Sequence, residues 1–176
     1  MNQITTPVKE EAIKQLQVYD RFEISGYIYT GRDAALPKLI KAVEEKSLDE
    51  REILLKGSVI FHTAVSPAGI GPTSSNKFDI ETSIPALSKA GVKIHLGKGA
   101  LEETTKRALQ EHSSIFAILP PVSALLTSKI LSKKIVAFEN EGMEAIHELK
   151  VDKVPAIVAI AHGRSIFEEK AIKERF

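Results

Sequence analysis

The sequence contains no cysteine. Without cysteine the chain cannot form a disulfide, use a thiolate as a nucleophile, or ligate zinc or an iron–sulfur centre through sulfur. An excess of one charge is also missing, because 24 basic and 23 acidic side chains leave a formal net charge of +1. Proteins that bind nucleic acid normally carry a basic surplus on one face. We therefore do not expect a nucleic-acid partner.

Long apolar runs are missing as well. No stretch approaches the length needed to cross a bilayer, and the opening segment MNQITTPVKEEAIKQL lacks the apolar core of a secretory signal. We expect a cytoplasmic protein that does not enter a membrane. The 176 residues are 43% apolar and 27% charged, which is enough for a buried core. We predict one domain over residues 1–176.

Strands and helices alternate along most of the chain. The segment YDRFEISGYIYT has a period of two, which predicts a strand, and RDAALPKLIKAVEEK predicts a helix that begins near Asp33 with Pro37 in its first turn. Further strands are predicted over GSVIFHTA, VKIHL, SIFAIL, KKIVAFE, VPAIVAIA and SIFEE, and further helices over TSIPALSKAG, ALEETTKRALQEH, PVSALLTSKIL and EGMEAIHEL. This order predicts an α/β domain with a largely parallel central sheet and added antiparallel strands.

Three polar loops follow predicted strands. They are YTGRDAA with Arg32, GIGPTSSNKFD with Thr73 and Lys77, and HLGKGALEET with Lys98. We expect the glycine-rich second loop to form neither helix nor strand. Ligands of open α/β sheets bind at the carboxyl ends of the strands, so the loops are expected to converge on one site. Three cations with hydroxyls between them suit a small dianion such as a dicarboxylate.

Each loop also has a plainer interpretation. Arg32 could be a surface arginine paired with Asp33, and the second loop an ordinary capped entry to a helix beginning at Thr82 or Ser83. The segment around Lys98 is not a nucleotide-binding P-loop, because a glycine follows the lysine where Ser or Thr is required.

The five histidines lack the spacing of metal ligands. His112 and His147 are expected on helices, at the surface or half-buried. His62 and His95 lie near strand ends and have two interpretations, ordinary residues or residues that face the cleft. For EGMEAIHEL we favour a capped helix with Met143 and Ile146 in the core.

Four segments together resemble a known family. SGYIYTGRDAA, GPTSSNKFD, GVKIHLGKGAL and GMEAIHELKV followed by VPAIVAI occur in the order and spacing of the small (beta) subunit of iron–sulfur-dependent class I fumarases and L-tartrate dehydratases. The resemblance covers about residues 18–168. It implies a single "swivelling" β/β/α domain and a partner alpha subunit that holds a [4Fe-4S] cluster, which acts as a Lewis acid on the substrate hydroxyl.

The resemblance also implies roles for individual residues. Arg32 and Lys98 match carboxylate-binding positions, and Thr73 matches a threonine that helps proton transfer together with an aspartate of the large subunit. A threonine hydroxyl is too weak an acid to act unaided, so such a partner is chemically required. Lys77 stands where the family has an arginine, which replaces a bidentate fork by a single charge. Leu36 and Pro37 replace a histidine and a basic residue.

The sequence thus predicts the substrate-binding and proton-transfer subunit of a hydro-lyase. The reaction would be reversible hydration of fumarate to malate, or dehydration of tartrate to oxaloacetate. A cysteine-free chain leaves the cluster to the alpha subunit, so we expect a hetero-oligomer, or a homodimer when the chain is isolated. Two alternatives stay open: a non-catalytic dicarboxylate-binding or regulatory domain derived from this family, and a structural interaction domain whose polar loops are ordinary surface.

Overall fold

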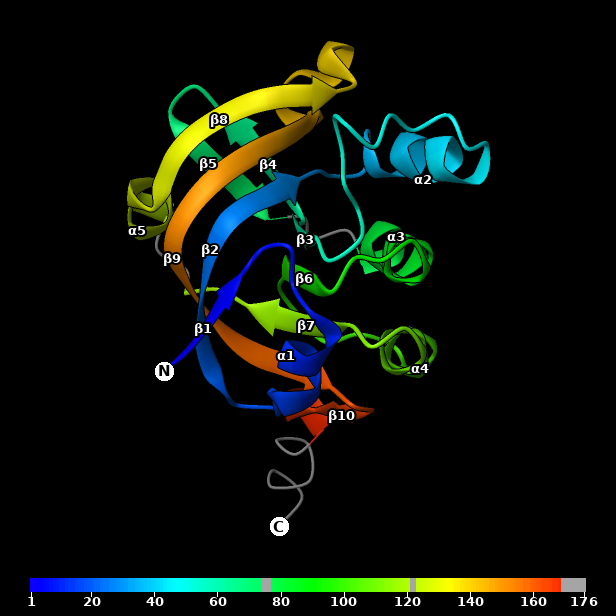
Figure 1. Cartoon of the computed structure of the whole chain (residues 1–176), viewed down its shortest axis with the longest axis vertical. Helices are drawn as coiled ribbons and strands as arrows, with labels where there is room; N and C mark the ends of the chain where they lie inside the picture. Colours follow the sequence, from blue (N-terminus) through cyan, green and yellow to red (C-terminus); the bar gives the residue numbers. More distant parts are fainter. Residues whose placement is uncertain (74–76, 121–122, 169–176) are drawn as a thin grey trace.

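The computed structural model describes residues 1–73, 77–120 and 123–168, and its centre is an eight-stranded sheet. The strands of this sheet are β1 (Asn2–Thr5), β2 (Arg21–Thr30), β3 (Val59–Phe61), β6 (Ile94–Gly97), β7 (Ile115–Ile118), β8 (Ile130–Ala137), β9 (Ile146–Ala161) and β10 (Arg164–Ser165). A separate hairpin consists of β4 (Thr63–Ser66) and β5 (Gly69–Thr73). The strands and the helices beside them are labelled in Figure 1.

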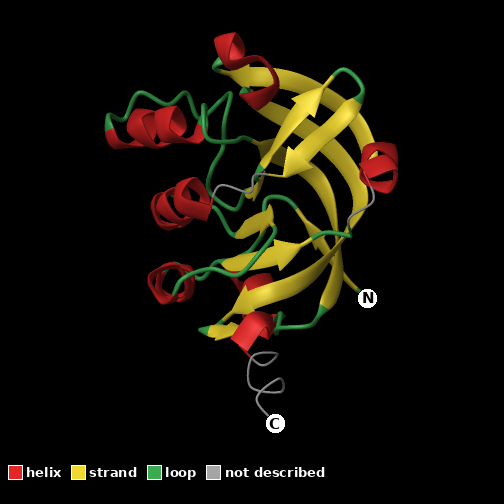
Figure 2. Ribbon diagram, turned by 180° about the vertical axis from the view of Figure 1, so that it is seen from behind, coloured by secondary structure: helices red, strands yellow, loops and turns green. Residues whose placement is uncertain are grey.

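The sheet combines parallel and antiparallel pairing. Neighbours along β1, β2, β3, β6 and β7 are parallel, whereas β9 is antiparallel to β2, β7, β8 and β10. Because β9 pairs with both β2 and β7, strands β2, β3, β6, β7 and β9 form a closed ring. The curvature of these strands is visible in Figure 2. The predicted α/β class with a mostly parallel sheet and added antiparallel strands is confirmed.

The helices are distributed around this sheet rather than gathered on one side (Figure 1). They are α1 (Glu10–Gln15), α2 (Leu36–Glu44), α3 (Lys77–Lys89), α4 (Glu103–Glu111), α5 (Ser123–Ser128) and the 3₁₀ helix η1 (Glu139–Glu144). In Figures 1 and 2, α2, α3 and α4 lie in a row on the same side. Among the residues that the structure describes, no helix combines the length and apolar character that a membrane span requires.

Two apolar clusters form the core. The larger draws side chains from the ring strands, including the fully buried Phe22 and Phe116. The second lies where α2 and α3 cover the sheet and includes Leu39, Ile60 and Leu87. Strand β2 shows why the sequence folds this way, because its alternate residues Phe22, Ile24 and Ile28 are all buried, as the period of two predicts.

Four local predictions were wrong. Residues 69–73 of the glycine-rich segment form strand β5, which pairs with β4. Helix α3 begins at Lys77 rather than at residue 82 or 83. The predicted EGMEAIHEL helix is divided between the 3₁₀ helix η1, which ends at Glu144, and strand β9, which begins at Ile146. The last strand ends at Ser165, so the SIFEE strand is limited to its first residue. In the first case the pairing with β4 sets an extended backbone that the local composition does not reveal.

Candidate functional site

The carboxyl ends of four parallel strands lie in register. Thr30, Phe61, Leu96 and Ala117 are partners across β2, β3, β6 and β7. Arg32 and Lys98 each follow this row by two residues, on either side of β3. Adjacent strands are about 4.8 Å apart, so the ends of β2 and β6 are separated by about 10 Å. The structure therefore brings the first and third polar loops to the same edge of the sheet.

Thr73 is brought to this edge by backbone pairing. It is the last residue of β5 and lies opposite Thr63, which follows the end of β3 by two residues. The Thr63 hydroxyl donates a hydrogen bond to the Gly71 carbonyl oxygen at 2.9 Å, which fixes the hairpin at the same place. The second loop thus starts between the other two. The side chains of Thr73 and Lys77 lie outside the described residues, and Lys77 is placed only as the first residue of α3.

Arg32 is paired with a residue that is distant in the sequence. Its Nε lies 3.7 Å from Oε1 of Glu144, the last residue of η1. Both atoms are buried and neither has a hydrogen-bond partner among the described residues. The side chain of Arg32 is still 25% exposed. Since the ion pair runs through Nε, it leaves the outer edge of the guanidinium, with the two Nη nitrogens, for a ligand.

The pairing with Glu144 was missed by sequence reasoning. We expected EGMEAIHEL to be a capped helix with Met143 in the core, but Met143 is 48% exposed, whereas Ile146 is buried as expected. One of the three glutamates of this segment, Glu144, pairs with Arg32 instead. Glu144 lies in the GMEA part of a segment that resembles the family, but nothing in the local sequence indicates that it pairs with Arg32.

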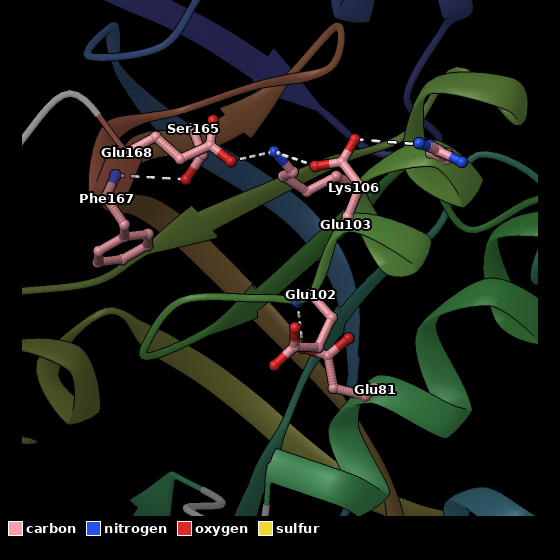
Figure 3. Close-up of polar contacts among 8 residues, drawn as sticks. Glu81, Glu102, Glu103, Lys106, Ser165, Phe167 and Glu168 are labelled. Carbon is pink, nitrogen blue, oxygen red and sulfur yellow. Dashed lines mark hydrogen bonds and ion pairs between the residues drawn. The ribbon is translucent and has the colours of Figure 1, made fainter. Parts of the chain in front are cut away.

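Lys98 follows β6 directly and is exposed. A Cβ added to the next residue, Gly99, would meet no atom within 4 Å, so the loop borders open space. The end of this loop is fixed by Glu81 of α3, whose Oε1 accepts a hydrogen bond from the Glu102 amide at 2.7 Å and whose other oxygen binds the Thr105 hydroxyl. Figure 3 shows Glu81 beneath Glu102 at the start of α4. A carboxylate of the chain itself therefore occupies the N-terminus of α4, and Lys98 is the cation that this loop offers to a ligand.

The buried lysine of the structure lies elsewhere and is not a nucleophile. The Lys106 ammonium, in a residue only 4% exposed, contacts Glu103 Oε2 at 2.7 Å and also Glu168. Figure 3 shows it between these two carboxylates. The hydrogen bond that Lys106 donates to Glu103, followed by the one it donates to Glu168, raises the pKa of Lys106. The amine is therefore protonated and links Glu168 to α4.

His62 and His95 lie beneath the edge and are buried. His62 Nε2 is 3.1 Å from His95 Nδ1, and His95 Nε2 is 2.9 Å from the Ser88 hydroxyl of α3. Burial lowers the pKa of His62 to about 4. Burial, and then the charge of His62, lowers the pKa of His95 well below its usual range. Both imidazoles are therefore neutral near pH 7, and neither faces an open cleft as a charged group.

The other two predictions about histidines have mixed outcomes. His112 is at the end of α4, as expected, but His147 lies on strand β9 and is buried. His147 lines a hollow of about 500 Å³ between β8 and the β4–β5 hairpin. Apolar side chains, among them Val65, Ile135 and Met143, form much of its wall. Lys133 and Lys134 also line this hollow, so its wall combines apolar and positively charged side chains.

The described residues do not form a metal centre of their own. Within residues 1–73, 77–120 and 123–168, no three His, Asp or Glu side chains are grouped so that they could hold a metal ion. The full sequence also has no thiol to ligate an iron–sulfur cluster. The residues of this chain therefore do not fit such a cluster.

Comparison with known proteins agrees with the resemblance. The family model described as "Fumarase C-terminus" matches residues 1–170, so the chain belongs to this family. An L(+)-tartrate dehydratase subunit beta assigned in Methanocaldococcus jannaschii is 32% identical over 172 residues, which cover 89% of this chain and 86% of that protein. The L(+)-tartrate dehydratase subunit beta of Escherichia coli is 26% identical and covered to 86%.

The same region also occurs inside longer relatives. The anaerobic class I fumarate hydratase of Escherichia coli is 28% identical over 184 residues, which cover 97% of this chain but only 33% of the relative. This chain therefore spans one third of the length of that enzyme, and most of a tartrate dehydratase beta subunit. The relatives are named as hydro-lyases, which supports lyase chemistry in general.

Proposed function

We propose that this chain is the substrate-binding and proton-transfer subunit of a hydro-lyase that hydrates fumarate reversibly to malate or dehydrates tartrate to oxaloacetate. The observation that carries the proposal is the convergence of three loops at one sheet edge. Arg32 and Lys98 flank the end of β3, and Thr73 pairs with Thr63 immediately beyond it. The swivelling β/β/α domain that the resemblance implies is part of this proposal.

Each residue has a role that its chemistry permits. The outer edge of the Arg32 guanidinium binds one carboxylate with two parallel hydrogen bonds, and the Lys98 ammonium binds the other. Lys77 adds a third positive charge at the start of α3. The Thr73 hydroxyl passes a proton at the substrate carbon to or from an acidic residue of the partner, because a hydroxyl alone is too weak an acid. The two cations hold the diacid in place while this proton moves.

The proposal assigns the iron–sulfur cluster to a cysteine-bearing alpha subunit. Two of the relatives are named as beta subunits, and this chain has no ligand set for a cluster. The expected complex is a hetero-oligomer whose active site combines this sheet edge with the alpha subunit. In this proposal the residues of this chain bind the substrate and move a proton, and they do not ligate metal.

Reconstitution tests the proposal. We expect no hydration of fumarate or dehydration of tartrate by the isolated chain, and clear turnover once the alpha subunit is added anaerobically with its cluster intact. The alpha subunit alone should also be inactive. Turnover by the isolated, metal-free chain would refute the assignment of the cluster to the alpha subunit. An inactive pair with a verified cluster would refute the proposed hydro-lyase function.

The non-catalytic alternative makes a different prediction. It is favoured by Lys77 and Leu36, which depart from the family pattern. Leu36, however, is only 3% exposed and packs in the second apolar cluster, so that departure affects the core rather than the loop surface. A regulatory domain would bind a diacid tightly without any partner, which calorimetry on the isolated chain detects.

Replacing Glu144 tests how Arg32 is oriented. Glu144→Gln keeps the size of the side chain and removes the ion pair. Because the two side chains are 25% and 35% exposed, we expect a small effect, a rise in KM of about two- to fivefold with kcat retained. Steady-state kinetics of the reconstituted enzyme measure it. A lower KM would show instead that Glu144 competes with the substrate for Arg32.

A further inference from the structure

Ser88, His95 and His62 form a continuous hydrogen-bonded chain inside the protein. The contacts are 2.9 Å from Ser88 Oγ to His95 Nε2 and 3.1 Å from His95 Nδ1 to His62 Nε2. The two rings lie 5.4 Å apart between centroids and are tilted by 31°. All three residues are at most 2% exposed. We call these residues the Ser88–His95–His62 chain.

The chain ends at an atom that the described residues leave unpaired. His62 Nδ1 is buried and has no hydrogen-bond partner among them. If each ring is neutral and each contact has one proton, this nitrogen is either an N–H without an acceptor or a lone pair without a donor. An apolar side chain would pack here without that cost, as Ile60 and Leu87 do in the cluster beneath α2 and α3. The polar chain therefore calls for a functional reason.

Its position links two of the three site loops. The His62 amide donates to the Leu96 carbonyl of β6 at 2.9 Å, and the next residue, Thr63, begins β4. Thr63 pairs with Thr73. On the other strand, His95 precedes Lys98 by three residues. The imidazole contact thus joins the strand that positions Thr73 to the strand that ends at Lys98.

We propose that the Ser88–His95–His62 chain positions Thr73 for proton transfer, and that His62 acts through Thr63 as a positioning residue. This inference rests on the proposed function. Hydrogen bonds have a preferred direction. The Ser88–His95–His62 chain therefore fixes the position of His62, the residue between β3 and β4, more closely than apolar packing would. A small shift of Thr73 slows proton transfer more than it weakens carboxylate binding, because Arg32 and Lys98 hold the substrate.

Three variants of the reconstituted enzyme separate this role from simple packing. His62→Leu removes the contact, His62→Gln retains a polar group that reaches toward His95, and Ile60→Val trims the same strand and face outside the chain. We expect His62→Leu to lower kcat at least about tenfold with KM changed less than about twofold, and its unfolding midpoint at pH 5 to stay at or above the wild-type value. His62→Gln should recover most of kcat, and Ile60→Val should leave it unchanged.

Several outcomes would overturn the proposal. The first is a wild-type kcat in His62→Leu. The second is a loss of kcat/KM in His62→Leu that comes from a higher KM, and the third is an equal loss of kcat in Ile60→Val. If His62→Leu does not fold, Ser88→Ala breaks the far end of the chain and should lower kcat in the same selective way; an unchanged kcat would then refute the proposal.

A second readout separates this inference from the proposed function. Hydrogen exchange of the amides of residues 63–73 in the isolated chain should be faster in His62→Leu than in Ile60→Val. If the wild-type pair shows no hydro-lyase activity, the proposed function fails, and the exchange result alone decides whether the chain holds the hairpin. Equal exchange in both variants would refute the positioning role whatever the activity.

Discussion

Thr73→Ala should lower kcat of the reconstituted enzyme by about 10²- to 10⁴-fold and leave KM within a small factor of the wild-type value. The magnitude is that of a positioned general acid–base group, and the selectivity follows because the hydroxyl acts on a proton rather than on the carboxylates. Backbone pairing of Thr73 with Thr63 places it between the loops that contain Arg32 and Lys98. Steady-state kinetics with fumarate and with tartrate measure both parameters.

Thr73→Ser is the matched control for this prediction. It keeps a hydroxyl at nearly the same position and should retain much of kcat. If Thr73 only held the backbone in place, Thr73→Ala and Thr73→Ser would change kcat by similar factors. A large rise in KM with kcat intact would move Thr73 from proton transfer to substrate binding.

The second large effect is loss of stability in acid, caused by the buried imidazoles. The pKa of His62 is about 4 in the folded chain, below its ordinary value of 6.5, because burial disfavours the charged form. Between these two values the unfolded chain binds more protons than the folded chain, so the free energy of unfolding falls as the pH falls from about 6.5 to about 4. At 1.36 kcal/mol per pKa unit, His62 alone accounts for about 3 kcal/mol. His95 acts in the same direction.

Urea unfolding of the isolated chain at several pH values measures this effect. His62→Leu removes one titrating group from the core, so its free energy of unfolding should depend less steeply on pH in this window than that of the wild type. Carboxylates elsewhere in the chain contribute equally to both proteins, so the difference between the two slopes reports His62 together with its effect on the pKa of His95. Identical slopes would show that the imidazole is not held neutral in the folded chain.

Sequence reasoning succeeded where local pattern determines structure. The alternation in β2, the helix with Pro37 in its first turn and the alternating order of strands and helices all follow from local spacing, although α2 begins at Leu36 rather than near Asp33. The convergence of Arg32 and Lys98 follows from a general property of parallel sheets, in which strand ends share an edge. The roles of these residues stay predictions, since geometry alone does not assign chemistry.

The failures concern contacts between distant segments. Glu144 reaches Arg32 across more than a hundred residues, and His62 meets His95 because β3 and β6 are neighbours, which neither segment reveals. Residues 69–73 form a strand despite their glycines, because β4 supplies the pairing partner. In each case tertiary packing decides a conformation or contact for which the local sequence has only a weak preference.

The most direct test of the central claim compares a diacid with a monoacid as inhibitors of the reconstituted enzyme. If Arg32 and Lys98 each bind one carboxylate, the wild type should bind succinate at least about tenfold more tightly than butyrate, since a hydrogen bond to a charged group contributes about 1.5–3 kcal/mol. Arg32→Ala and Lys98→Ala should each remove most of this preference by weakening succinate binding, while butyrate binding changes little. If both variants keep the wild-type preference for succinate, the two side chains do not bind the diacid between them.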